Sequence, residues 1–269
     1  MKRSIIFFIS FLHIAAFGSN LPKLGEGNYY NNEQIWQAQE DGLEQPKPVE
    51  LSVNQREPNA YDLSVSSGKD VRKYTLEILT AASARLTGDN GSCSVVISQT
   101  SLDTVDWQAE FNPTKCGWPS AHAEIRTRWL IGQGIFLSGD SSNTTLAPDY
   151  FGRSQGIALR RAFQYSGWFV IDPRQSKEST TTEEAQFVRG LKLHSEGARQ
   201  ELIRSDGTST GIEIELAALT YQGNAAQILK LALYRVGEDR AFTYIWSENG
   251  ADRLGMNLRW LQVGLTRQD

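Results

Sequence analysis

Short runs in which apolar and polar residues alternate recur along most of the chain. In residues 74–80, for example, Tyr74, Leu76 and Ile78 are separated by polar residues. An alternation of period two places successive side chains on opposite faces of a β-strand. The pattern returns in residues 94–98, 121–130, 212–216, 229–233, 242–246 and 256–260. The chain is therefore predicted to consist mainly of β-strands.

Turn-forming residues separate these runs at fairly regular intervals. They cluster at residues 88–91, 205–208, 237–239 and 249–250, and the pair Asn249-Gly250 is a hairpin signal. Many short strands joined by tight turns are typical of an antiparallel sandwich or barrel. We predict an all-β fold, mainly antiparallel, with a β-sandwich or β-barrel domain over residues 73–269.

The segment before this domain, residues 19–72, is polar and poor in aliphatic side chains. Residues 31–39 predict one short helix, with Asn31 as its N-cap and Gly42 as its stop. Pro46 and Pro48 then favour an extended linker. We predict that residues 19–72 form a polar N-terminal arm or linker.

The first 18 residues have the three parts of a secretory signal peptide. Lys2 and Arg3 supply a positive region, residues 4–17 are largely apolar, and Ala16 and Gly18 place small residues before a cleavage point. The apolar run is shorter than the ~20 residues that a membrane-spanning helix needs. We expect cleavage after Gly18, a secreted or periplasmic location, and no integral membrane segment in the mature chain.

The charge of the chain argues against one class of partner, and its two cysteines predict a disulfide. The chain has 27 basic and 31 acidic residues, and loss of Lys2 and Arg3 leaves 25 basic against 31 acidic, a net charge of −6. Such a surface is not expected to bind nucleic acid, which requires neutralisation of phosphates by Lys and Arg. In an exported protein Cys93 and Cys116 are predicted to form a disulfide.

A G-x-S-x-G motif is the first candidate for chemistry. Gly152, Ser154 and Gly156 match the turn that presents the nucleophile of α/β-hydrolases, and Asp172 and His194 follow in the order of that class. However, no alternating strand and helix pattern precedes the motif. The hypothesis of a serine hydrolase acting through Ser154 therefore competes with a glycine-rich bend that enters a strand.

A row of polar side chains on the predicted strand 121–130 is the second candidate. His122, Glu124, Arg126 and Arg128 fall on one face of that strand. Arg makes paired hydrogen bonds to carboxylate or sulfate groups, and His can move a proton near neutral pH. The row is consistent with a carbohydrate-active enzyme, a lyase or hydrolase, on a β-sandwich. The competing interpretation is a solvated sheet face with cross-strand ion pairs.

Aromatic residues offer a further means of recognising sugars, because large rigid rings provide apolar surfaces. Seven tryptophans are present, and most fall at alternating positions that suggest packing in a core. Trp107 and Trp118, in a turn-rich segment, are predicted to be the exposed pair.

These observations favour binding over catalysis. No metal or cofactor is expected, because only His122 and His194 remain after the signal peptide and no metal-ligand spacing or nucleotide-binding fingerprint is present. The sequence predicts an exported, non-catalytic binding or surface-assembly protein. Its partner would be a glycan or another exported protein. The two enzyme hypotheses above stay as alternatives.

Overall fold

A computed structural model describes residues 23–89, 91–99, 105–111, 128–132, 134–138, 156–172, 174, 184–220 and 227–268 of the chain. The predicted signal peptide lies outside these residues. The elements are β1 (Gly27–Tyr30), α1 (Asn32–Glu40), β2 (Glu50–Glu57), β3 (Ala60–Ser67), β4 (Asp70–Thr80), β5 (Ser83–Gly88), β6 (Gly91–Gln99), β7 (Val105–Phe111), β8 (Arg128–Gly132), β9 (Gly134–Ser138), β10 (Ile157–Arg161), β11 (Gln164–Ile171), β12 (Gln186–His194), β13 (Glu196–Ile203), β14 (Ser209–Thr220), β15 (Gln227–Arg235), β16 (Thr243–Glu248), β17 (Arg253–Asn257) and β18 (Leu261–Arg267).

Strands β1 to β10 form a closed barrel in which every neighbouring pair is antiparallel. Each strand from β2 to β10 follows its predecessor around the wall, and β1 closes the barrel between β2 and β10. The closing register joins Tyr29 to Arg161 on one side and to Leu51 on the other. Closure leaves no unpaired edge in this part of the molecule.

The alternating pattern explains why these strands close around an apolar interior. Tyr74, Leu76 and Ile78 of β4 are all buried, whereas the residues between them are more exposed. The same alternation in β2, β3, β5 and β6 supplies the rest of the described barrel core, which includes Leu51, Val53, Leu63, Val65, Leu86, Val95 and Ile97. The polar set of each strand from β2 to β6 therefore lies on the outer wall.

The prediction of an N-terminal polar arm over residues 19–72 is wrong where that segment forms strands, at residues 27–30, 50–57, 60–67 and 70–72. This segment contains β1, β2 and β3, which are strands of the barrel wall. Tyr61, Leu63 and Val65 are buried in the barrel core and alternate with Asp62 and Ser64. A segment in which only every second residue is apolar has a polar average composition even though one face is fully buried.

The short helix is confirmed, but the side chain of Asn31 does not cap it as predicted. Helix α1 begins at Asn32 and ends at Glu40, and Gly42 has a φ of 65° just beyond it. The Asn31 side chain makes no capping bond. Instead its amide donates to Lys47 O at 2.9 Å and its carbonyl oxygen accepts from Val49 N at 2.8 Å. Asn31 thus fixes the entry of β2. Within the described residues no helix is long and apolar enough to cross a membrane.

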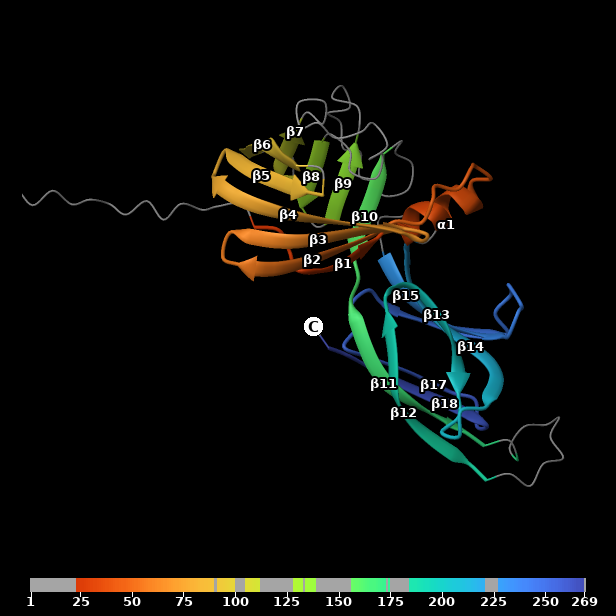
Figure 1. The fold of residues 1–269 in the computed structure, drawn as a ribbon. Helices are drawn as coiled ribbons and strands as arrows, with labels where there is room; N and C mark the ends of the chain where they lie inside the picture. Colours follow the sequence, from red (N-terminus) through yellow and green to blue (C-terminus); the bar gives the residue numbers. More distant parts are fainter. Residues whose placement is uncertain are drawn as a thin grey trace, which may run out of the picture.

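The remaining described strands form a sandwich of two four-stranded antiparallel sheets. One sheet has the order β12-β11-β18-β17, and the other has the order β13-β14-β15-β16. Leu229, Leu231 and Leu233 of β15 are fully buried between the sheets, as their alternation predicts. In Figure 1 the barrel and the sandwich are separate bodies, and β10 and β11 follow one another from one into the other. The all-β, antiparallel prediction is confirmed, with a barrel and a sandwich both present.

Two sequence signals near the C-terminus have a different structural meaning from the one expected. The Asn249-Gly250 turn joins β16 to β17, which belong to different sheets, so it is a crossover and not a hairpin. Leu258 and Trp260 do not continue a strand. They flank Arg259, whose φ of 68° makes the tight turn between β17 and β18.

Candidate functional site

Most of the residues proposed from sequence as a binding row lie outside the described residues. This applies to His122, Glu124 and Arg126. Arg128 is the first residue of β8, where its backbone pairs with Glu110 of β7 and Ser138 of β9. The proposal that these four residues bind an anionic sugar stays a prediction.

Ser154 also lies outside the described residues, but the segment after it bears on the hydrolase hypothesis. Residues 157–161 form barrel strand β10, whereas a nucleophile elbow leads into a helix. Asp172 and His194 lie near opposite ends of the β11–β12 pair, since Gln164 is opposite His194. Eight residues of strand separate those ends by roughly 27 Å. Asp172 and His194 therefore do not form one acid–base pair.

Of the two cysteines in the predicted disulfide, only Cys93 lies among the described residues. Cys93 lies in the barrel core on β6 with 1% of its surface exposed. Its expected partner, Cys116, lies outside the described residues, so the disulfide stays a prediction. Within the described ranges no group of three or more His, Cys, Asp or Glu side chains could hold a metal ion.

Among the described residues, the structure places exposed aromatic side chains on β16, and the predicted exposure of Trp107 and Trp118 stays a prediction. Trp118 lies outside the described residues, and only the backbone of Trp107 is described, in β7. On β16, Tyr244 and Trp246 face solvent with exposures of 54% and 44%, and their rings meet edge to face at 5.3 Å. Ile245 between them packs against the sandwich core. The aromatic set of this strand was interpreted as core from its alternation, and that interpretation is wrong.

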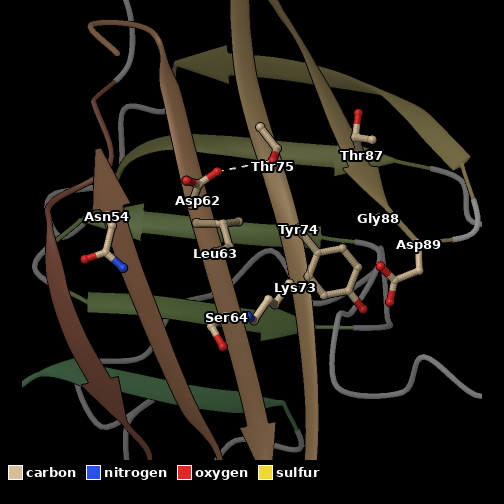
Figure 2. Close-up of a pocket in the computed structure, with 10 residues that line it drawn as sticks. All are labelled: Asn54, Asp62, Leu63, Ser64, Lys73, Tyr74, Thr75, Thr87, Gly88 and Asp89. Carbon is tan, nitrogen blue, oxygen red and sulfur yellow. Dashed lines mark hydrogen bonds between the residues drawn. The ribbon is translucent and has the colours of Figure 1, made fainter. Parts of the chain in front are cut away.

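The candidate site is an open groove of about 550 Å³ on the barrel wall, across strands β2 to β5. One side is a row of outward-facing polar residues, Asn54, Asp62, Thr75 and Thr87, which are successive cross-strand partners. Figure 2 shows these four side chains following one another across the strands. The volume of the groove lies in the range of small-molecule binding sites.

The opposite side and the floor of the groove follow from the same register. Ser64 pairs with Lys73, and these two residues line the other side together with Asp89. Between the two rows run Leu63, Tyr74 and Gly88, which pair across β3, β4 and β5. The side chains of Leu63 and Tyr74 are buried in the barrel core. The floor is therefore largely backbone, with polar side chains on both sides.

The groove offers hydrogen-bond donors and acceptors with little net charge. The Thr75 hydroxyl donates to Asp62 at 3.2 Å, and the Arg56 guanidinium lies 3.7 Å from the same carboxylate. The Asp62 and Arg56 side chains are each 51% exposed, so a ligand can reach them. The lining contains the carboxylates of Asp62 and Asp89 and the ammonium of Lys73. This set suits an uncharged polar ligand better than an anionic one.

Sequence analysis missed this groove because no single segment contains it. Each contributing strand supplies one or two ordinary polar residues to the site. Their juxtaposition depends on the register of four strands, which pairs Asp62 with Thr75 and Thr75 with Thr87. The alternation of β3, from Tyr61 to Val65, was the one available signal that residues 60–67 belong to a sheet. Comparison of the chain with known protein families, curated proteins and solved structures found no match.

Proposed function

We propose that this chain is an exported, non-catalytic binding protein that holds an uncharged, hydroxyl-rich ligand, an oligosaccharide, in the groove on the barrel wall. The observation that carries the proposal is the pair of polar rows on either side of a backbone floor. Sugar hydroxyl groups both donate and accept hydrogen bonds. Asp62 accepts, Lys73 donates, and Asn54 and Thr75 do both, so the groove can satisfy such a ligand from two sides.

The groove's exposure also fits binding better than chemistry. Water has free access to half-exposed side chains, whereas catalysis gains most from groups held in a water-excluded site. The titratable residues that line the groove, Asp62, Lys73, Tyr74 and Asp89, include no histidine or cysteine. A ligand bound here would be held by several modest hydrogen bonds, each worth about 0.5–1.5 kcal/mol.

The test is binding of the mature protein to an array of neutral oligosaccharides, followed by titration calorimetry of the best binder. Asp62→Ala removes a charged acceptor, and such hydrogen bonds contribute about 1.5–3 kcal/mol. We expect an affinity loss of roughly tenfold or more. Glu77→Ala is the matched control, because Glu77 of β4 is also an outward-facing carboxylate of the barrel wall but lies outside the groove. The absence of any binding, or equal losses in both variants, would overturn the proposal.

Export and the disulfide belong to the same proposal. The apolar N-terminal segment motivates cleavage after Gly18, and the absence of a free cysteine among the described residues supports pairing of Cys93 with Cys116. Mass spectrometry of secreted material should give an N-terminus at or within two residues of Ser19 and no alkylation of cysteine without reductant. Secreted material that begins at Met1 would exclude cleavage after Gly18, and alkylation of both cysteines would exclude the bridge.

A further inference from the structure

The barrel and the sandwich meet at a small joint formed by α1, β10, β13 and β14. The Thr220 amide of β14 donates to Glu33 of α1 at 3.1 Å, and the Gln37 side chain donates to Thr220 O at 3.2 Å. The Asn32 side chain donates to Glu196 O of β13. Helix α1 thus connects the two bodies through polar contacts.

At the centre of the joint lie one guanidinium and two carboxylates, all nearly inaccessible to water. Arg160 of β10 lies between Glu33 and Glu196, with Nη2 3.4 Å from Glu33 Oε2 and 3.0 Å from Glu196 Oε2. The side chains of Arg160, Glu33 and Glu196 are 7%, 3% and 2% exposed. With all three ionised the cluster carries one uncompensated negative charge. Burial of such a charge is strongly unfavourable.

The hydrogen bonding of the cluster is incomplete when all three groups are ionised. Arg160 Nε and Nη2 both donate to Glu196 Oε2, and Nη2 also donates to Ala218 O. Arg160 Nη1 and Glu33 Oε2 have no hydrogen-bond partner among the described residues. A proton on one of the two carboxyls would remove the excess charge and turn an acceptor into a donor. Burial, reinforced by the neighbouring Glu33 and opposed by Arg160, raises the pKa of Glu196 to about 7.

The other titratable groups around Glu196 do not supply the proton change. His194 of β12 accepts the Glu196 amide at Nδ1 and stacks on Tyr30 of β1 at 4.4 Å. Burial lowers the pKa of His194, a shift whose effect on closure has the opposite sign to that of Glu196. The Tyr30 hydroxyl donates to Glu50 of β2, and burial together with that carboxylate raises the pKa of Tyr30 further above neutrality.

We infer that the cluster of Glu33, Arg160 and Glu196 makes the joint between barrel and sandwich respond to pH, closing firmly when one carboxyl binds a proton and loosening when that proton is lost. In an opened joint Glu196 would titrate at its ordinary pKa of 4.5, whereas in the closed joint it titrates near 7. The closed form therefore binds a proton that the open form releases. Closure is favoured below about pH 4.5 and weakens as the pH rises to about 7.

The test is amide hydrogen exchange by NMR, with rates corrected for the intrinsic effect of pH. The Thr220 amide reports opening because it bonds across the joint to Glu33. Release of one proton, with a pKa that falls from about 7 to 4.5, predicts a roughly 30-fold rise in the opening constant between about pH 5.5 and about pH 8. Glu196→Gln mimics the protonated carboxyl and should abolish this rise.

Two further measurements keep the inference falsifiable. Glu248→Gln on β16 changes an exposed carboxylate of the same sheet and should keep the wild-type response. If Glu196→Gln does not fold, the wild-type protein labelled with ¹³C at Glu carboxyls should still show one carboxyl that titrates near pH 7. A pH-independent Thr220 amide, a Glu196→Gln variant that responds like wild type, or titration of every Glu carboxyl below about pH 5.5 would overturn the inference.

Discussion

Replacement of Arg160 by Met is the sharpest test of the electrostatics at the joint. Met preserves much of the length and volume of the side chain but removes the guanidinium. Glu33 and Glu196 would then be buried with no cation, and Ala218 O would lose the donor that Nη2 provides. Loss of one partner from a buried ion pair costs about 3–5 kcal/mol, because the remaining charge stays uncompensated.

The expected loss in the free energy of unfolding is therefore about 3–5 kcal/mol at neutral pH, with a smaller loss in mild acid, where Glu196 can be protonated. Urea unfolding followed by circular dichroism measures it. A triple variant that adds Glu33→Gln and Glu196→Gln leaves no buried charge and should recover most of the loss.

The matched control is Arg85→Met in the same barrel. Arg85 forms an ion pair with Glu77 at 3.4 Å, the same separation as Arg160 and Glu33, but both side chains are about half exposed. Exposed pairs contribute about 0–1 kcal/mol. A loss in Arg160→Met no larger than that in Arg85→Met would refute the argument that burial makes this cluster important.

Three more outcomes follow from packing and site geometry. Leu231→Ala removes a side chain with no exposed surface from the sandwich core and should lower stability by about 2–5 kcal/mol in urea unfolding. A Cβ added at Gly264 would lie 2.6 Å from the Trp168 ring, so Gly264→Ala should cost about 1–3 kcal/mol and shift tryptophan fluorescence; an unchanged midpoint and spectrum would contradict this. Ser154→Ala should leave any hydrolysis of a chromogenic ester unchanged, since Asp172 and His194, which follow it, do not form an acid–base pair; loss of turnover would instead establish a hydrolase.

Much of the β-structure could be predicted from alternation alone. The Leu229, Leu231 and Leu233 set and the Ile212, Ile214 and Leu216 set both lie in the sandwich core, as their spacing indicates. Alternation shows which residues share a face of a strand. It does not show which face is buried when both faces contain large side chains. On β16, Ile245 packs inward and Tyr244 and Trp246 remain outside. A pleated strand offers both choices, and the neighbouring sheet decides between them.

The division into barrel and sandwich was harder to predict, because it depends on which strands pair. Asn249-Gly250 would form a turn whether it joined two strands of one sheet or connected two different sheets. Only the pairing of β16 with β15 and of β17 with β18 makes it a crossover. The N-terminal strands were missed for a related reason. Their outward residues, such as Ser52, Asn54 and Asp62, are strongly polar and dominate the composition of the segment.

The joint illustrates the limit of sequence patterns most clearly. The three charged residues, Glu33, Arg160 and Glu196, come from a helix, a barrel strand and a sandwich strand that are distant in sequence. In the local sequence, each looks like an ordinary solvent-exposed charged residue. Hydrophobic contacts are non-directional, so an apolar joint of similar size would tolerate sliding of one body on the other. Arg160 does not allow that freedom, because its donors must reach Glu196 and Ala218 O together. Since a buried ion pair contributes little net stability, we expect the cluster to contribute mainly to the fixed position of sandwich against barrel.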